Sequence, residues 1–270
     1  MGSEMCIRDS NNGEKYRFIW SGKKKRRDAG VGILVKNDPS IIIEDPDFSN
    51  SRIMALNINI YGFKTRIVIA YSPTNADISV STKESFYRDL RKACNKDNKN
   101  RKLIVLGDFN AETNMVLKKT DYNGKSVLLD NLCNDNGEKL KSHCRQYKLC
   151  MTQSFFNHPL EERYTWYSPD GITKKVLDYI LVENFTQQFI SECRTIQEDK
   201  FISDHRLVIA SLKTPTNKGT RWAPRAKKKS QLDISALEKS EIHEKLKLSL
   251  IHISEPTRPL YISYAVFCLK

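Results

Sequence analysis

The chain has 270 residues, of which 39% are hydrophobic, enough to bury a full core. This composition excludes disorder throughout and fits one domain with tails. Lys and Arg outnumber Asp and Glu by 45 to 32, a formal net charge of +13. Such an excess favours polyanionic partners, nucleic acid first among them, although a domain with a basic tail would give the same total.

The seven cysteines form no C-x-x-C pair and no metal-ligand spacing. Their odd number and irregular spacing indicate free thiols in a reducing intracellular compartment, nuclear or cytoplasmic. Charged residues interrupt the apolar runs before they reach the length needed to span a bilayer. We therefore expect no membrane association.

Both ends of the chain differ in character from its middle. Residues 1–10 and 249–270 resemble translated sequencing-adapter read-through, an artefact that should be excluded from the prediction of the fold. Residues 214–248 begin with a Lys-, Arg- and Pro-rich stretch, which predicts a flexible basic tail. We expect that tail to be a solvated linker, with nonspecific phosphate contact or a nuclear address as the alternative. The predicted domain spans residues 11–213.

The first half of the domain is predicted to be rich in strands. Alternating or β-branched apolar residues predict strands at residues 30–35, 41–43, 54–60 and 65–70. The short connection at residues 61–64 folds the last two into a hairpin, so this pair should be antiparallel. A capping box at residues 81–84 predicts a helix, and its Phe86, Leu90 and Cys94 should pack on a sheet.

The second half mixes helix and buried strands. A helix is expected to follow Asn136 and Gly137, with Leu140, Cys144 and Tyr147 on one face. Apolar runs predict buried strands at residues 103–106, 176–182 and 207–212. Strands and helices without regular βαβ alternation indicate an α/β (α+β) fold, in which two packed mixed or antiparallel sheets have helices outside.

Asp108 and Asn110 lie at the end of an apolar strand, in the sequence LIVLGDFN at residues 103–110. The sheet fixes such a carboxylate, and the following turn exposes it to substrate. An apolar strand ending in Asp also fits the Mg²⁺-binding strand of a P-loop nucleotidase. That alternative fails because Lys119 stands where the P-loop before Gly124 needs its first glycine.

Asp204 and His205 precede the apolar strand at residues 207–212. Asp204 could hold a cation or water while a neutral His205 accepts a proton near pH 7. Such a pair at a turn is more often an ordinary polar corner. Asp178 favours a functional role for His205 over a polar corner. It lies inside an apolar run, where a buried carboxylate needs a partner, and histidine is a natural donor.

Five motifs, in this order, resemble those of the endonuclease/exonuclease/phosphatase superfamily. They are GVGI at 30–33, YSPT at 71–74, GDFN at 107–110, LDYI at 177–180 and SDH at 203–205. YTWYSPDG at 164–171 is similar to the tryptophan segment of non-LTR retrotransposon endonucleases and craniofacial development protein 2-like proteins. The resemblance covers residues 16–212 and implies a four-layer α/β sandwich.

The resemblance implies metal-dependent hydrolysis of phosphodiesters in DNA, and it assigns roles to five residues. Asp178 would orient His205, and Asp108 would help to align the attacking water. Either Asp108 or His205 would take the proton. Asn110 and Tyr71 would hold phosphate oxygens.

The same resemblance implies a cation and a DNA contact surface. Asp204 and Asp108 would bind Mg²⁺, with Mn²⁺ as the alternative, and the ion would place positive charge on the phosphate. No small-molecule cofactor is expected. Trp166, Tyr167 and Arg206 would contact DNA, since aromatic rings can stack on bases or wedge into the minor groove. For Trp166, burial in the hydrophobic core is an alternative to the DNA contact, and the sequence favours neither.

The chain departs from the family pattern near its start. The family's first strand carries an Asn, and a Glu further on is the principal metal ligand. Both lie upstream of the counterpart of Trp20, and Glu14 is too close to Gly30 to replace the Glu. We therefore expect an N-terminally truncated domain whose first strands are missing and whose sheet edge is exposed. Such a chain should bind Mg²⁺ poorly and have little or no nicking activity.

Two rival functions remain. One keeps the fold but acts on a phosphoinositide or sphingolipid head group, which the net charge and the tryptophan segment disfavour. The other is a non-catalytic nucleic-acid-binding relic, which would bind DNA in a salt-sensitive way without cutting it.

Overall fold

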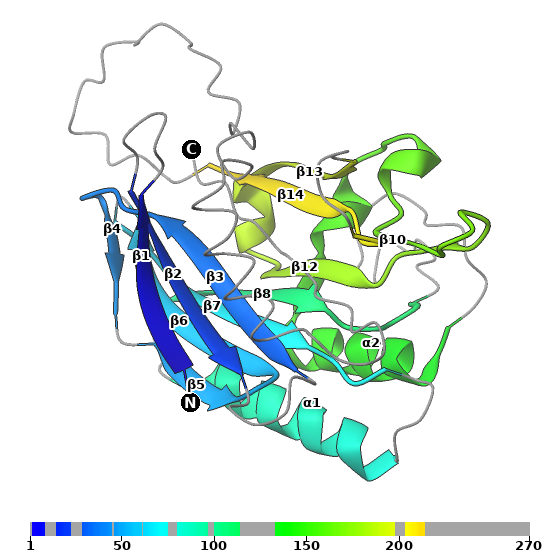
Figure 1. Cartoon of the computed structure of the whole chain (residues 1–270), viewed down its shortest axis with the longest axis horizontal. Helices are drawn as coiled ribbons and strands as arrows, with labels where there is room; N and C mark the ends of the chain where they lie inside the picture. Colours follow the sequence, from blue (N-terminus) through cyan, green and yellow to red (C-terminus); the bar gives the residue numbers. More distant parts are fainter. Residues whose placement is uncertain are drawn as a thin grey trace, which may run out of the picture.

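The computed structural model describes residues 2–8, 15–22, 29–44, 46–60, 62–74, 80–96, 100–113, 133–197 and 203–213 (Figure 1). The strands and α-helices are β1 Gly2–Arg8, β2 Lys15–Gly22, β3 Gly30–Lys36, β4 Ile41–Ile43, β5 Asp47–Asn50, β6 Ile53–Ile60, β7 Phe63–Tyr71, α1 Val80–Asn95, β8 Lys102–Asp108, α2 Asp135–Tyr147, β9 Leu149–Met151, β10 Trp166–Tyr167, β11 Lys174–Lys175, β12 Asp178–Glu183, β13 Ile190–Ile196 and β14 Leu207–Leu212. The predicted basic tail and the second adapter-like segment lie outside these residues.

A seven-stranded mixed sheet forms the centre of the molecule, in the order β4-β6-β7-β8-β12-β9, with β5 also paired to β6. The pair β7–β8 is parallel and its other pairs are antiparallel. β6 and β7 pair from Ile60 and Phe63 at the turn to Ile53 and Ala70, which confirms the predicted hairpin. Its alternating apolar residues give this sheet two buried faces.

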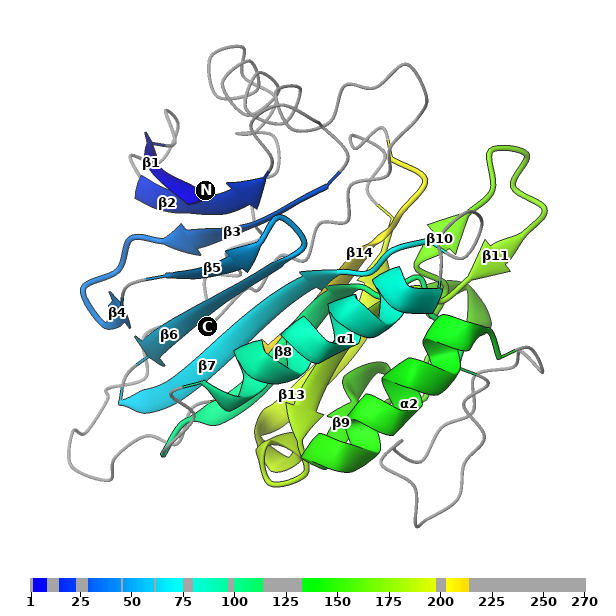
Figure 2. The same ribbon diagram turned by 90° about the horizontal axis from the view of Figure 1, so that it is seen from below.

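Both α-helices cover one face of the central sheet, as Figure 2 shows. The predicted contact of Phe86, Leu90 and Cys94 with the sheet is confirmed, because all three are buried in that core. The predicted start of the second helix is wrong. Asn134 caps α2 by accepting a hydrogen bond from the backbone N–H of Gly137, so the N-G turn signal lies inside the first helical turn.

The opposite face of the central sheet packs on a second layer of strands. This core joins apolar residues of β2 and β3 with residues of β13 and β14. Every second residue of β3 is buried, at Val31, Ile33 and Val35, and the same alternation holds in β14 at Val208 and Ala210. The layer order is therefore helices, central sheet and second strand layer. In the described ranges the predicted fourth, helical layer is not seen.

Two other expectations bear on the boundaries of the elements. The segment at residues 1–10, set aside on sequence grounds, contributes β1, which pairs with β2 from Lys15 to Ser21. The strand expected over residues 176–182 begins at Asp178. β13 was not predicted.

None of the described helices combines the length and the apolar character needed to cross a membrane.

Candidate active site

Three polar residues form one row across neighbouring strands of the central sheet. Tyr71 of β7 pairs with Asp108 of β8, and Asp108 pairs with Asp178 of β12. Residues that pair across strands point to the same face, so the three side chains share one face at the ends of their strands. All three are buried, and Tyr71 belongs to the core beneath the second strand layer. The row therefore faces that layer.

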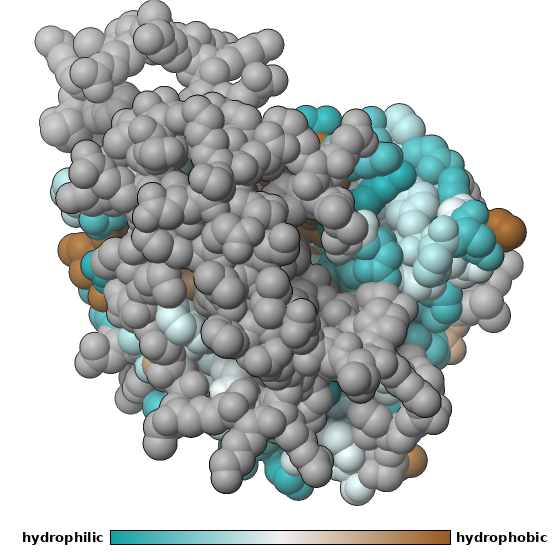
Figure 3. Space-filling model, viewed as in Figure 1, coloured by the Kyte–Doolittle hydropathy of each residue, from teal (hydrophilic) through white to brown (hydrophobic). Residues whose placement is uncertain are grey.

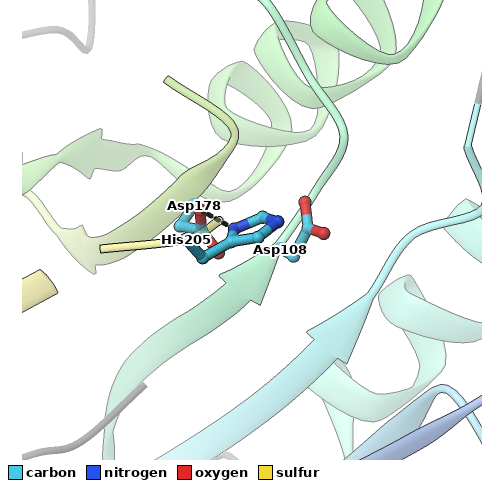
Figure 4. Close-up of side chains that lie close together, drawn as sticks. All are labelled: Asp108, Asp178 and His205. Carbon is cyan, nitrogen blue, oxygen red and sulfur yellow. Dashed lines mark hydrogen bonds and ion pairs between the residues drawn. The ribbon is translucent and has the colours of Figure 1, made fainter. Parts of the chain in front are cut away.

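His205 reaches this row from the second layer, just before β14. Its Nδ1 lies 2.8 Å from Oδ2 of Asp178 (Figure 4). One candidate ligand atom from each of Asp108, Asp178 and His205 lies within 4.8 Å of the others. Three segments that are far apart in the sequence thus converge, which is the geometry that the resemblance implied for these residues.

The charge state of His205 follows from its neighbours. Burial alone would lower the pKa of His205, but the carboxylates of Asp178, Asp108 and Asp204 outweigh burial and raise the pKa to about 9. Without a bound cation, His205 is therefore an imidazolium at neutral pH, and its Nδ1–H donates to Asp178. This differs from the neutral histidine expected from the ordinary pKa. A cation beside Asp108 would lower the pKa of His205 again.

Gly107 explains why the motif needs a glycine before Asp108. Its φ of +144° is unfavourable for side chains, and an added Cβ would lie 1.8 Å from the carbonyl oxygen of Ala70. The close approach of β7 and β8 at this point aligns Tyr71 with Asp108. Beyond it, Asp108 Oδ1 accepts a hydrogen bond of 2.8 Å from the backbone N–H of Asn110, which fixes the carboxylate at the turn.

Asn110 and Tyr71, the predicted phosphate ligands, lie beside Asp108. Asn110 has a φ of +47°, and its Nδ2 donates to the carbonyl oxygen of Ser72 at 3.0 Å. Burial, followed by the charge of Asp108, raises the pKa of Tyr71 to about 12. The Tyr71 hydroxyl therefore stays protonated and can donate a hydrogen bond. The phosphate-binding roles themselves remain predictions.

Asp204, a predicted metal ligand, lies outside the group of three. Its Oδ2 accepts a hydrogen bond of 2.7 Å from Nε1 of Trp166. Trp166 is half-buried and belongs to neither apolar core. Its backbone forms a bridge with His205. The structure therefore places Trp166 against the segment that carries Asp204 and His205, and the DNA contact of this residue stays a prediction.

Tyr167 and Arg206 form a stacked pair next to this segment. The guanidinium carbon of Arg206 lies 3.8 Å from the centroid of the Tyr167 ring, and Nη1 donates to the carbonyl oxygen of Glu161. Lys174 forms an ion pair of 3.0 Å with Glu161. Figure 3 shows mainly hydrophilic residues around β10 on this face. The pair is half-buried, which is compatible with the predicted nucleic-acid contact.

Several buried polar side chains that were not predicted bind the backbone of the segments around the candidate site. Thr165 Oγ1 accepts the backbone N–H of Asp178 at 3.1 Å, and Gln153 Nε2 donates to the Asp178 carbonyl oxygen at 2.7 Å. Asn136 Nδ2 donates to the carbonyl oxygen of Pro73 at 2.8 Å. Thr165 and Asn136 are fully buried. Their partners come from distant segments, so no local sequence pattern marks them.

The donor set fits a small divalent cation. Two buried carboxylates concentrate negative charge, and carboxylate oxygens are the ligands that Mg²⁺ and Mn²⁺ prefer. Asp178 Oδ2 and His205 Nδ1 bind each other, so Asp108 is the carboxylate best placed to hold the ion. Asp204 would bind the same ion from the position in which the Trp166 indole holds its carboxylate.

The mixed α/β fold, with Asp108, Asp178 and His205 brought together at one side of the central sheet, agrees with the endonuclease/exonuclease/phosphatase superfamily. The sequence model of the endonuclease-reverse transcriptase family matches residues 65–209, a range that contains all the candidate site residues. The chain belongs to this endonuclease-reverse transcriptase family.

Individual relatives are more distant. Craniofacial development protein 2 from Bos taurus is 25% identical over 202 residues, which are 75% of this chain and 33% of that protein. The chain thus spans about a third of the length of this curated relative. The 3′ phosphatase NExo from Neisseria, bound to a product DNA hairpin, has a TM-score of 0.51 and 18% identity over 71% of this chain and 77% of that one. That likeness shows the fold.

The endonuclease domain of TRAS1, a telomere-specific non-LTR retrotransposon, is similar at 17% identity. The match covers 76% of this chain and 75% of that chain, with a TM-score of 0.45.

Proposed function

We propose that this domain hydrolyses phosphodiester bonds in DNA with a divalent cation, as an endonuclease of the retrotransposon type. The observation that carries the proposal is the convergence of Asp108, Asp178 and His205 within 4.8 Å of one another. The family match supports it, and the net charge of +13 favours a polyanionic substrate. The Neisseria structure with bound DNA adds an example of this fold on DNA.

The geometry assigns positions to these side chains. Asp178 holds His205 through Nδ1, and Figure 4 shows the other ring nitrogen on the side of Asp108. A water or a phosphate oxygen at that point would contact both His205 and Asp108, which is the placement that hydrolysis needs. The protonated Tyr71 would donate to a phosphate oxygen from the neighbouring strand. A divalent cation at Asp108 would supply positive charge to the phosphate.

Nicking of supercoiled plasmid tests this proposal. We expect slow, Mg²⁺-dependent nicking that stops in EDTA and in His205→Ala. His158→Ala is the matched control, because His158 is also a partly buried histidine paired with a carboxylate, at 2.7 Å from Glu192. It should nick like the unchanged chain. Equal nicking by His205→Ala would refute the proposed site.

A substrate comparison separates the proposal from its rivals. Hydrolysis of a soluble phosphoinositide in preference to plasmid DNA would contradict the DNA assignment. Salt-sensitive DNA binding without any cleavage, in Mg²⁺ or Mn²⁺, would contradict catalysis by this chain. A slow rate that is still lost in His205→Ala would agree with the proposed site.

A further inference from the structure

Residues 165–167 have backbone partners on both sides, β11 on one and the segment around His205 on the other. On one side, the backbone N–H of Thr165 donates to the carbonyl oxygen of Lys175 at 2.9 Å. On the other side, Arg206 N–H donates to the Thr165 carbonyl oxygen at 2.8 Å, and Tyr167 N–H donates to the Asp204 carbonyl oxygen at 2.9 Å. The segment therefore pairs with β11 on one side and with the loop that carries His205 on the other.

Two consecutive side chains of this segment reach two different acids of the site. Thr165 is fully buried, and its Oγ1 accepts the backbone N–H groups of Leu177 at 2.9 Å and Asp178 at 3.1 Å. The indole N–H of Trp166 donates to the Asp204 carboxylate at 2.7 Å. Successive residues of a strand point to opposite sides, so one dipeptide can hold two loops at once.

We infer that Thr165 and Trp166 are positioning residues for the proposed hydrolytic site, on which this inference rests. Thr165 fixes the backbone at the start of β12, where Asp178 must meet His205. Trp166 fixes the carboxylate of Asp204, which lies on a short connection before β14 and points to the indole.

The chemistry of the indole suits this role. Indole nitrogen only donates, so its partner must be an acceptor such as a carboxylate oxygen. A hydrogen bond to an ionised carboxylate is stronger and more directional than a neutral one. Groups that hold the ligands of a cation typically change its affinity, or the activity, by roughly 10–100-fold when they are removed. Trp166 should therefore affect cation binding without touching the cation.

Indole NMR signals test the contact without any assay of activity. Trp166→Phe keeps an aromatic ring and removes the donor, and it identifies the Trp166 signal among those of the three tryptophans. We expect this indole proton to exchange slowly with solvent in the unchanged chain and faster in Asp204→Ala, which removes the acceptor. An unchanged exchange rate in Asp204→Ala would overturn the assigned contact.

A double-mutant cycle on Mg²⁺ affinity tests the positioning role. Trp166→Phe should weaken Mg²⁺ binding roughly tenfold, and it should have no further effect in an Asp204→Ala chain, in which the acceptor of the indole is absent. Trp20→Phe is the matched control, because Trp20 lies in β2 and stacks on Phe18. Full affinity in Trp166→Phe, or an equal loss in both backgrounds, would overturn the inference. If the unchanged chain binds no Mg²⁺, the proposed function fails, while the indole exchange still decides the contact.

Thr165 is tested by two replacements of similar size. Thr165→Ser keeps the acceptor oxygen, whereas Thr165→Val removes it with little change in volume. We expect Thr165→Val to speed the hydrogen exchange of the Leu177 and Asp178 amides and to lower kcat for nicking with little change in KM. Thr165→Ser should leave both the amide exchange and kcat close to those of the unchanged chain. Protected amides in Thr165→Val would overturn the role of Thr165.

Discussion

Asp108 and Asp178 lie directly opposite each other on the antiparallel strands β8 and β12, and both carboxylates are buried. Like charges in such a pair repel each other, and a cation that binds between strand ends relieves the repulsion. Ligands that bind only the folded state also raise the free energy of unfolding. A cation bound beside these two acids should therefore stabilise the fold.

The first prediction concerns this link. Millimolar Mg²⁺ or Mn²⁺ should raise the midpoint of urea unfolding of the unchanged chain, and Asp108→Asn should abolish the rise because it removes the charge of the best-placed ligand. Unfolding curves with the cation and with EDTA measure the difference. Glu44→Gln, which changes an exposed acid remote from the site row, should leave the rise intact. A rise that persists in Asp108→Asn would place the cation elsewhere.

The local patterns of the sequence account for much of the fold. Alternation predicted the β6–β7 hairpin, and a capping box predicted α1, because both signals depend on neighbouring residues. The convergence of Asp108, Asp178 and His205 was implied by the family resemblance, whose motifs contain all three residues. Acids at or near strand ends are functional candidates because their burial needs partners.

Other features depend on contacts that no local pattern encodes. β13 was not predicted because Glu192 and Arg194 interrupt its apolar residues, and its pairing with β14 determines the strand. α2 begins one residue before Asn136, because Asn134 caps it while contacting Glu112 and Asn110 in another loop. The contact between Trp166 and Asp204 likewise requires the folded arrangement.

The second prediction concerns Gly107. Gly107→Ala should destabilise the fold by about 3 kcal/mol or more, because the strained φ adds to a collision between Cβ and the Ala70 carbonyl oxygen. Gly62→Ala is the matched control. Gly62 also has a positive φ, of +86°, but nothing lies within 4 Å of its added Cβ, so the loss should be only about 1 kcal/mol. Equal losses in urea unfolding would contradict the close approach of β7 and β8.

The third prediction concerns the buried Arg66, whose side chain joins three elements. It donates to Ala93 at the end of α1, to Asn57 and to Asp47. Arg66→Met should lower the free energy of unfolding by about 3–5 kcal/mol because it leaves the Ala93 carbonyl oxygen and the Asn57 amide oxygen buried without their donor. Lys96 binds the same Asp47 carboxylate but is 58% exposed, so Lys96→Met should cost less than about 1 kcal/mol. Similar losses for both variants would argue against a structural role for Arg66.

The fourth prediction concerns pH. Burial, with the charge of Arg91, lowers the pKa of His143 to about 3, whereas an unfolded histidine titrates near its ordinary value of 6.5. The unfolded chain therefore binds a proton that the folded chain excludes, and stability should fall as the pH drops from 6.5 toward 3. His143→Phe should reduce this fall, because its ring cannot be protonated. Urea unfolding at pH 7.5 and pH 5 measures the effect, and an identical fall in the variant would assign it to other groups.

The convergence of three distant segments on one phosphodiester is tested most directly by a crystal structure with Mn²⁺ and an anomalous difference map. We expect a Mn²⁺ peak at Asp108, with the hydrogen bond between Asp178 and His205 retained. A peak remote from Asp108, or a His205 side chain turned away from Asp178, would contradict the proposed site.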